Sequence, residues 1–430
     1  MPRVTAFRAL RYAGSDGADI SSLTAPPYDV IGPERRAELL KRDPHNVVAL
    51  ELPEGPLDRA APGNRYGVAA ERWRRWRAEG VLVADARDSI YVLQQSFESQ
   101  GEQRTRCSFV AAVGLEPFSA GVILPHELTL PKAIEDRLNM TRATAANLSP
   151  ILALFSDTER VADSLAAKVT GTPPLARATD DSGGRASLWA ITDPADHAAL
   201  ADLLSERSVI IADGHHRYTT ALAYRDERRE TDGALRPEAP YESVMMALVS
   251  VEDAGLAVSP THRIADAPSG AFDPDAFWTA LREHFDLRDL PAGHPGRALS
   301  SIPGPAFIVR TRGGTTKIAV LRDDVSHDQA FPEHASQAWR GLDTAVLQEL
   351  VLRPLLDIHP DVPQTLDRLA YTKDAHAALD AAQTHDAVFI MSATPIAQVS
   401  QLAFSGEMMP QKSTYFAPKL PSGLLFRSLD

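Results

Sequence analysis

The segment Ser208-Val-Ile-Ile-Ala-Asp-Gly-His-His-Arg-Tyr-Thr-Thr-Ala-Leu222 contains an apolar run that ends at Asp213-Gly214 and is followed by a helical pattern. The apolar run predicts a buried strand, and the residues from His215 onward predict a helix. The first amides of a helix have no intrahelical acceptor and carry the positive end of the helix dipole. We therefore expect the turn between this strand and this helix to bind an anion.

The side chains at this turn suit a phosphate group. We expect Gly214, His215 and Arg217 to hold it through backbone and charged side-chain donors. Asp213 has three explanations that the sequence leaves open: it binds Mg²⁺, it acts as a base, or it caps the helix. A helix cap would explain Asp213 but not the His-His-Arg cluster. We therefore take Asp213 and His216 as candidate catalytic residues, and Asp213 also as the candidate metal ligand.

Zinc is a less suitable occupant of the same turn. Neighbouring residues on a helix project about 100° apart, so His215 and His216 cannot readily share one ion. Phosphate or carboxylate binding uses the same donors with looser geometry, and we favour it.

The length of the chain indicates more than one domain. Its 430 residues exceed what one hydrophobic core usually supports. We place the boundary in a stretch rich in proline and glycine, so that residues 1–270 form an N-terminal and central α/β region. Residues 271–430 then form a C-terminal α/β region.

Charge and cysteine content limit the partners and the compartment. A net charge of −13 argues against binding to nucleic acid or to an anionic membrane. Cys107 is the only cysteine, which excludes an intrachain disulfide and fits a reducing cytosol. No run approaches the roughly 20 apolar residues of a membrane span, and no signal-peptide pattern is present. We expect a cytoplasmic protein.

The order of predicted elements indicates a mixed α/β (α+β) fold. Strand-like and helix-like segments alternate from Arg160 to Tyr224, which is typical of α/β layering. The runs Ile90 to Phe97 and Arg106 to Leu115 predict a hairpin. Asn46 to Leu52 predicts a strand, and Leu342 to Leu355 predicts one helix.

A charged stretch follows Pro125. His126 and Glu127 are expected on a loop before a helix, where reactive groups are common, and a salt-bridged loop is the alternative. A second histidine four residues after His126 is absent, so this is not a metalloprotease signature. Asp136 and Arg137 are further candidates, although an exposed amphipathic helix with charge pairs would also explain them.

The segment Gly406-Glu-Met-Met-Pro-Gln-Lys-Ser413 nearly copies a phosphate loop. We reject the match, because Gln411 replaces the second glycine and prolines interrupt the helix that should follow. Lys412, Ser413 and Thr414 still predict anion contacts from a loop, unless the segment is only tied across the surface.

Pro260-Thr-His-Arg263 follows another predicted strand. Arg263 either joins an anion pocket or pairs with an acidic neighbour, and the sequence leaves both open. His262 is a further candidate site residue.

Seven segments together resemble a widespread bacterial family known only as a domain of unknown function (family 1015). The segments are Pro26-Pro-Tyr-Asp-Val-Ile31, Pro125-His-Glu-Leu-Thr129, Asp136-Arg137, Asn147-Leu-Ser-Pro-Ile151, Ala212-Asp-Gly-His-His-Arg-Tyr218, Pro260-Thr-His-Arg263 and Met409-Pro-Gln-Lys-Ser-Thr-Tyr-Phe-Ala-Pro-Lys419. The resemblance spans nearly the whole chain and implies no activity.

Asp213-Gly-His-His-Arg217 also resembles the core motif of the ParB and sulfiredoxin superfamily, whose members bind nucleotide phosphates at this turn. The superfamily includes CTP-hydrolysing partition proteins, sulfiredoxins that use ATP, and free serine kinases. The resemblance implies a ParB/sulfiredoxin-like core, phosphate contacts from Gly214 to Arg217, and a metal-linked or catalytic Asp213. The chain lacks the basic surface of partition proteins, and histidine stands where sulfiredoxins need cysteine, so a kinase-like activity is favoured.

These observations predict a nucleotide-dependent phosphotransferase that acts on the hydroxyl of a small polar metabolite, such as serine. Mg²⁺ and ATP or ADP are the expected cofactors, and a homo-oligomer is compatible. Glu127 or His216 would accept the hydroxyl proton, and Lys412 or Arg263 would steady the transferring group. The alternatives are a phosphatase or other hydrolase of a phosphorylated metabolite, such as phosphoserine, and a non-catalytic nucleotide sensor.

Overall fold

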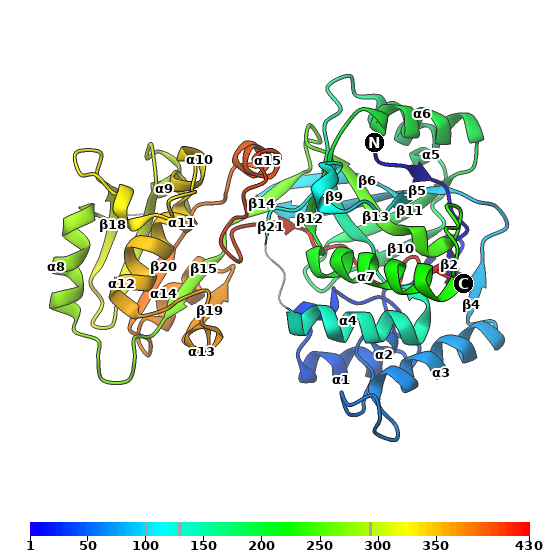
Figure 1. Ribbon diagram of the computed structural model, residues 1–430, viewed down its shortest axis with the longest axis horizontal. Helices are drawn as coiled ribbons and strands as arrows, with labels where there is room; N and C mark the ends of the chain where they lie inside the picture. Colours follow the sequence, from blue (N-terminus) through cyan, green and yellow to red (C-terminus); the bar gives the residue numbers. More distant parts are fainter. Residues whose placement is uncertain (100, 128–130, 292–294) are drawn as a thin grey trace. The chain divides into compact units, whose positions relative to one another are not determined.

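The computed structural model describes residues 1–99, 101–127, 131–291 and 295–430, and no side chain of residues 131–133. These residues form a mixed α/β protein, as the sequence predicts (Figure 1). The chain divides into two compact units. Over the described residues, the first unit comprises Met1–Pro125, Thr129–Ala257 and Pro418–Asp430, and the second comprises His126–Leu128 and Val258–Ala417.

A mixed sheet forms the centre of the first unit. Its strand order in the described residues is β3-β10-β11-β5-β6-β13-β9-β12-β7, with β1 paired to β6. The strands are β1 (Val4–Thr5), β3 (Ala18–Asp19), β5 (Ile90–Ser99), β6 (Glu102–Gly114), β7 (Ile123–Leu124), β9 (Ile151–Phe155), β10 (Ala176–Thr179), β11 (Arg185–Ile191), β12 (Val209–Asp213) and β13 (Ser243–Ser250). All residues of β13 are buried, because β6 and β9 flank it. β12 pairs antiparallel to β9 and parallel to β7.

Helices and short strands complete the first unit. The helices are α1 (Pro33–Arg42), α2 (Val48–Glu51), α3 (Arg65–Ala78), α4 (Pro131–Thr144), α5 (Val161–Thr170), α6 (Pro194–Ser205) and α7 (His215–Asp232), with 3-10 turns η1 (Tyr28–Val30), η2 (Phe118–Ala120) and η3 (Pro240–Glu242). Two small sheets pair β2 (Leu10–Tyr12) with β4 (Leu82–Ala84) and β8 (Ala146–Asn147) with β22 (Arg427–Ser428). Apolar residues of α5, α6 and α7 share one core with the strands. Figure 1 shows α4 packed between α7 and α3.

The expected strand from Asn46 to Leu52 is wrong, because this segment contains the short helix α2. Its apolar residues are buried, and such a run does not distinguish a strand from a buried helix by periodicity. The Asn46 side chain accepts the Val48 N–H and donates to the Ser22 and Thr24 carbonyls, which starts the turn. The consequence for the site is that Glu51 lies at the end of a buried helix.

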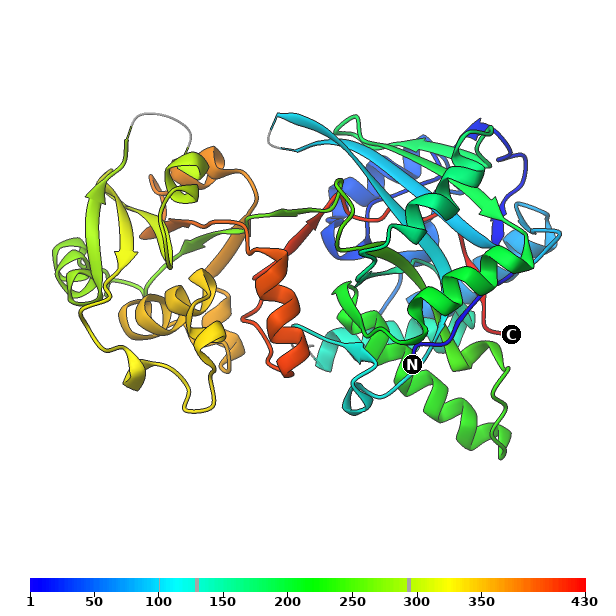
Figure 2. The ribbon, with the colours of Figure 1, turned by 90° about the horizontal axis from the view of Figure 1, so that it is seen from above.

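The C-terminal segment, residues 418–430, belongs to the first unit (Figure 2). Ser422 pairs with Ala25, Phe426 pairs with Leu10, and β22 pairs with β8. The last residues of the chain are therefore part of the same body as β12 and α7.

The second unit is built on an antiparallel sheet with strand order β16-β18-β17-β20-β15-β19 in the described residues. The strands are β15 (His262–Ala265), β16 (Phe285–Asp289), β17 (Ala306–Thr311), β18 (Thr316–Leu321), β19 (Leu369–Thr372) and β20 (Ala387–Ile390), with β14 (Ala257–Ser259) and β21 (Tyr415–Ala417) as a separate pair. The helices are α8 (Pro274–His284), α9 (Pro295–Ser300), α10 (Gln337–Arg340), α11 (Asp343–Leu347), α12 (Arg353–Leu356), α13 (Pro363–Leu366), α14 (Ala375–Ala381) and α15 (Ile396–Ser405), with the 3-10 turn η4 (Asp328–Ala330).

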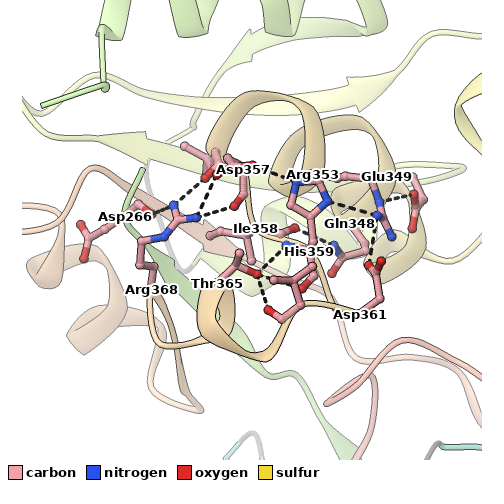
Figure 3. A network of polar contacts seen from close by, with 12 residues as sticks. Asp266, Gln348, Glu349, Arg353, Asp357, Ile358, His359, Asp361, Thr365 and Arg368 are labelled. Atoms are coloured by element: carbon pink, nitrogen blue, oxygen red, sulfur yellow. Dashed lines mark hydrogen bonds and ion pairs between the residues drawn. The ribbon is translucent and has the colours of Figure 1, made fainter. Parts of the chain in front are cut away.

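The helix expected from Leu342 to Leu355 is present as one continuous helical stretch, in which the π-helical turn η5 (Gln348–Leu352) joins α11 to α12. A network of polar contacts follows it (Figure 3). Arg368 donates to the backbone carbonyls of Asp266, Leu356 and Asp357. Arg353 and Asp357 contact His359 from opposite sides of its ring. These contacts fix the loop that leaves α12, so we assign this network a structural role.

No helix of the described residues is long and apolar enough to cross a membrane.

Candidate functional site

The turn between β12 and α7 has a conformation that requires glycine. Gly214 has φ of 101°, which is the left-handed region. A Cβ atom at this position would lie 2.9 Å from Nε of Arg217. Glycine therefore allows the Arg217 guanidinium to lie over the turn. Among the described residues, no side chain caps the start of α7.

Asp213 forms ion pairs with two cations of the first unit. Nζ of Lys419 contacts Oδ1 of Asp213, and Nη2 of Arg217 donates to Oδ2 at 2.8 Å. Burial opposes ionisation of Asp213, but Lys419, Arg217 and His215 outweigh it and lower the pKa to about 2. Asp213 therefore pairs with these cations rather than capping α7.

This arrangement changes the expected roles of Asp213. A carboxylate with a pKa near 2 is a weak base at neutral pH. Both of its oxygens already accept from cations, which disfavours Mg²⁺ at the same position. Among the described residues, no three histidine, cysteine or acidic side chains are grouped as metal ligands. The donor set around Asp213 does not fit Mg²⁺, and we assign Asp213 no metal.

Arg217 connects the turn to the rest of the first unit. Its Nη1 donates to the carbonyl of Pro150 and, at 3.4 Å, to the hydroxyl of Ser149. Burial acts to lower the pKa of Arg217, but Asp213, Tyr28 and other negative groups raise it overall. The guanidinium stays charged and bridges β12 to the segment before β9.

The two histidines of the motif have different surroundings. His215 is 5% exposed, and its charge contributes to the low pKa of Asp213. His216 is only half-buried. The two rings therefore occupy different environments at the start of α7.

A small cavity lies beside Arg217 in the first unit. Its lining residues come from several of the segments that the sequence analysis singled out: Tyr28, Glu51, Arg137, Met140, Ala146, Asn147, Leu148, Ser149, Ile151, Arg217, Thr220 and Val244. It has about 50 Å³ of space for solvent. At about 10–15 Å³ for each water, this volume suits a few waters or one small polar molecule and is too small for a nucleotide.

Glu51 is the buried carboxylate of this cavity, with 1% of its surface exposed. Burial raises the pKa of Glu51, although hydrogen bonds from Ser149 and Ser422 and the charge of Arg137 oppose the shift. Oε2 of Glu51 accepts from the Ser422 hydroxyl at 2.9 Å. Among the described residues, no cation forms an ion pair with Glu51. A buried carboxyl of raised pKa is suited to proton transfer.

Arg137 lies at the same cavity, and Asp136 holds it. Nε of Arg137 donates to Oδ2 of Asp136 at 2.9 Å, and the guanidinium stacks 4.1 Å from the Tyr28 ring centroid. Burial opposes ionisation of Asp136, but Arg137 lowers its pKa overall. Arg137 thus lines the same cavity as Arg217, and Asp136 pairs with Arg137.

The remaining candidates belong to the second unit. Nε2 of His126 and the Thr414 hydroxyl are 2.9 Å apart. Oε1 of Glu127 accepts the Lys412 N–H at 3.3 Å, and Glu127 forms a β-bridge with Met409. The next two residues of this motif lie outside the described residues. His126 and Glu127 thus help to hold the loop that contains Lys412, Ser413 and Thr414.

Arg263 also holds this loop. It is 4% exposed, and Nη2 donates to the Lys412 carbonyl at 3.1 Å. Burial lowers the pKa of Arg263 to about 10 despite the charges of Tyr371 and Asp343. The Ser413 hydroxyl is buried and donates to the Pro410 carbonyl. The loop that contains Lys412, Ser413 and Thr414 is therefore held by hydrogen bonds within the second unit.

His262 is buried in the second unit, where its Nδ1 accepts the Met391 N–H at 3.1 Å. It links β15 to the end of β20.

The sequence analysis did not include Glu51, Tyr28, Ser149 or Lys419 among the site residues. Tyr28, Ser149 and Lys419 lie in segments that it quoted, so membership of those segments was a usable signal. No signal identified Glu51, because its segment was interpreted as a strand.

A comparison with known protein families agrees with the resemblance to family 1015 that the sequence indicates. The family model described as protein of unknown function (DUF1015) matches residues 4–345. No curated protein sequence matches the chain.

Solved structures provide distant similarities. A free serine kinase in complex with AMP is 15% identical, with 69% of this chain and 84% of that chain covered and a TM-score of 0.33. SbnI with a C-terminal truncation from Staphylococcus aureus is 11% identical, with 74% and 86% covered and a TM-score of 0.35. A conserved hypothetical protein from Pyrococcus furiosus is 16% identical, with 70% and 90% covered and a TM-score of 0.33.

Proposed function

Since the chain belongs to the family of proteins of unknown function DUF1015, whose name specifies no activity, we propose from its own residues that it is a nucleotide-dependent phosphotransferase. It transfers a phosphoryl group to the hydroxyl of a small polar metabolite, as a serine-kinase-like enzyme would. One observation carries the proposal. Lys419 and Arg217 both bind the carboxylate of Asp213, so two cationic side chains lie at the uncapped start of an 18-residue helix.

Physical chemistry supports phosphate binding by this group of residues. Cationic side chains and the first amides of a helix both donate to phosphate oxygens. The dipole of α7 adds to the positive potential at the same place. The residues present therefore fit the phosphates of a nucleotide, which would supply the phosphoryl group when bound. Lys419, Arg217 and the first amides of α7 would hold them.

The hydroxyl acceptor is assigned to the cavity beside Arg217. Its size suits a small metabolite, and Glu51 is the carboxyl in it whose pKa is raised. In the proposed reaction the new oxygen–phosphorus bond forms at the acceptor hydroxyl, and the proton of that hydroxyl passes to Glu51. The bond between the transferred phosphorus and the bridging oxygen of the nucleotide breaks, and the nucleotide leaves with one phosphate fewer. We prefer Glu51 to Asp213 for this step because the pKa of Asp213 is about 2.

Calorimetric titration with ATP, ADP and CTP tests the proposal. We expect one of these nucleotides to bind, and a coupled assay to detect its turnover with a panel of small hydroxyl compounds. Arg217→Ala should lose both binding and turnover, while Arg228→Ala, on the same helix but paired with Asp232, should keep them. An Arg217→Ala variant with full nucleotide-dependent activity would contradict the assignment.

The alternative activities give different results in the same experiment. Nucleotide binding without turnover of any acceptor would favour a sensor. Absence of nucleotide binding, with release of phosphate from phosphoserine, would favour a phosphatase.

A further inference from the structure

Two histidines of the second unit contact each other at the end of α8. Nδ1 of His284, the last residue of α8, lies 3.3 Å from Nδ1 of His327, which directly precedes the 3-10 turn η4. The ring centroids are 5.3 Å apart, and the ring planes are inclined by 58°, so the rings are not stacked. Both residues are half-buried, and solvent can therefore reach the pair.

The backbone of Arg322 holds both histidines. Its N–H donates to the His284 carbonyl at 3.0 Å, and its carbonyl lies 3.0 Å from Nε2 of His327. Because a carbonyl only accepts, Nε2 of His327 carries the hydrogen, and Nδ1 of the neutral ring carries the lone pair. Histidines that bind metals usually donate their other ring nitrogen to a carbonyl or carboxylate in this way, which fixes the ligand nitrogen.

The distance between the two rings matches that between two ligands of one ion. An imidazole nitrogen lies about 2.0–2.1 Å from zinc, so two such nitrogens at the tetrahedral angle are about 3.3–3.4 Å apart. Neutral imidazole is the form that binds a metal. Burial and the charge of His327 lower the pKa of His284 despite the opposing charge of Glu283, which favours the neutral ring.

We propose that His284 and His327 bind one divalent transition-metal ion, such as Zn²⁺, through the Nδ1 atoms of both rings. The site lies within the second unit and is independent of the proposed function. Among the described residues, no third histidine, cysteine or acidic side chain joins the pair, so water fills the remaining positions around the ion. Imidazole nitrogen suits zinc, copper and nickel rather than Mg²⁺ or Ca²⁺.

Metal binding changes the position of one hydrogen. In the metal-free pair, Nδ1 of His284 donates its hydrogen to Nδ1 of His327, because Nε2 of His327 already donates to a carbonyl. When the ion binds, this hydrogen leaves Nδ1 of His284 and solvent returns one to Nε2 of the same ring. Both rings stay neutral, and each forms one coordinate bond. The ion would cross-link two segments 43 residues apart and so stabilise the folded second unit.

A simple hydrogen bond between the rings is the competing explanation. Such a pair would hold the segment before η4 against α8 without any metal. The two explanations differ in the response to Zn²⁺. A shared ion needs both rings, so loss of either ring removes the site, and loss of the second ring then adds little. Rings that meet only through a hydrogen bond would each affect Zn²⁺ uptake independently or not at all.

The test is calorimetric titration of the metal-free full chain with zinc chloride. The unaltered chain is compared with His284→Gln, His327→Gln and the double variant, because glutamine keeps a polar side chain at each position. We expect each single variant to weaken one binding event by at least about 10-fold, since loss of an outer partner of a metal-bound histidine already costs 10- to 100-fold. The double variant should match the single ones, and it also measures binding at the other histidines of the chain.

His197→Gln is the matched control. Nε2 of His197, on α6, also bonds to a backbone carbonyl, that of Ile191 at 2.8 Å, but no second imidazole among the described residues contacts its ring. This variant should bind Zn²⁺ as the unaltered chain does.

Urea unfolding gives a second measurement that does not depend on heat of binding. Zn²⁺ should raise the unfolding midpoint of the unaltered chain and of His197→Gln, and it should leave the midpoint of the double variant unchanged. Far-UV circular dichroism checks that every variant is folded. The inference is overturned if the unaltered chain takes up no more Zn²⁺ than the double variant, or if the two single losses add independently.

Discussion

The pKa of Asp213 gives a quantitative prediction for stability. The folded protein lowers this pKa from 3.8 to about 2, and the side chain is 18% exposed. At about 1.4 kcal/mol for each tenfold change, this difference corresponds to roughly 2.5 kcal/mol of stabilisation at neutral pH. We therefore expect Asp213→Asn to lower the free energy of unfolding of the first unit by about 2.5 kcal/mol at pH 7.

The same shift predicts how the loss depends on pH. Because the folded state has the lower pKa, the stabilisation is fully present above about pH 4 and disappears as the pH falls toward 2. The difference between the unaltered chain and Asp213→Asn should shrink to about half at pH 3.

Urea denaturation followed by tryptophan fluorescence and far-UV circular dichroism at pH 7, 4 and 3 measures this difference. Asp226→Asn is the control on the same helix, since Asp226 is 58% exposed and its partner Arg225 is the preceding residue. Its replacement should change stability by less than about 0.5 kcal/mol at every pH. A difference for Asp213→Asn that is equally large at pH 7 and pH 3 would refute the electrostatic explanation.

Three further predictions concern other residues. Glu51→Gln should lower turnover about 10²- to 10⁴-fold and remove the acid limb of the pH–rate profile. Calorimetry should still detect nucleotide binding by this variant. Unchanged turnover would exclude Glu51 as the proton acceptor. Gly214→Ala should destabilise the chain by about 1–3 kcal/mol in urea unfolding, because φ at this position is 101°. It should also weaken ADP binding, because the added methyl group would displace Arg217. A variant as stable as the unaltered chain would contradict the expected strain at Gly214. Burial raises the pKa of Asp343 to about 6, so the folded carboxyl binds its proton more tightly than the unfolded one, and the second unit should gain stability as the pH falls from 7 to 5. Asp343→Asn should lose this gain, and an unchanged pH dependence would argue against it.

Local sequence patterns were sufficient for the turn at Asp213. An apolar run, a glycine and a helical pattern specify a strand, a turn and a helix within about fifteen neighbouring residues, and β12 and α7 follow this prediction. The mixed α/β class follows from the same kind of local alternation. The segment from Asn46 to Leu52 shows where local patterns fail. Its apolar residues are buried in a short helix, and the side chain of Asn46 ties the start of that helix to the distant Ser22 and Thr24 carbonyls.

The assembly of the site depends on contacts between residues far apart in the chain. Lys419 is 206 residues from Asp213, and Ser422 is 371 residues from Glu51, so no local pattern connects either pair. The tertiary structure alone joins them, because the C-terminal segment returns to the first unit and is anchored there by Arg106 and Gln95. The sequence by itself determined that a strand and a helix meet at a glycine beside an aspartate. Which cations surround that aspartate, and hence its pKa, was decided by the packing of distant segments.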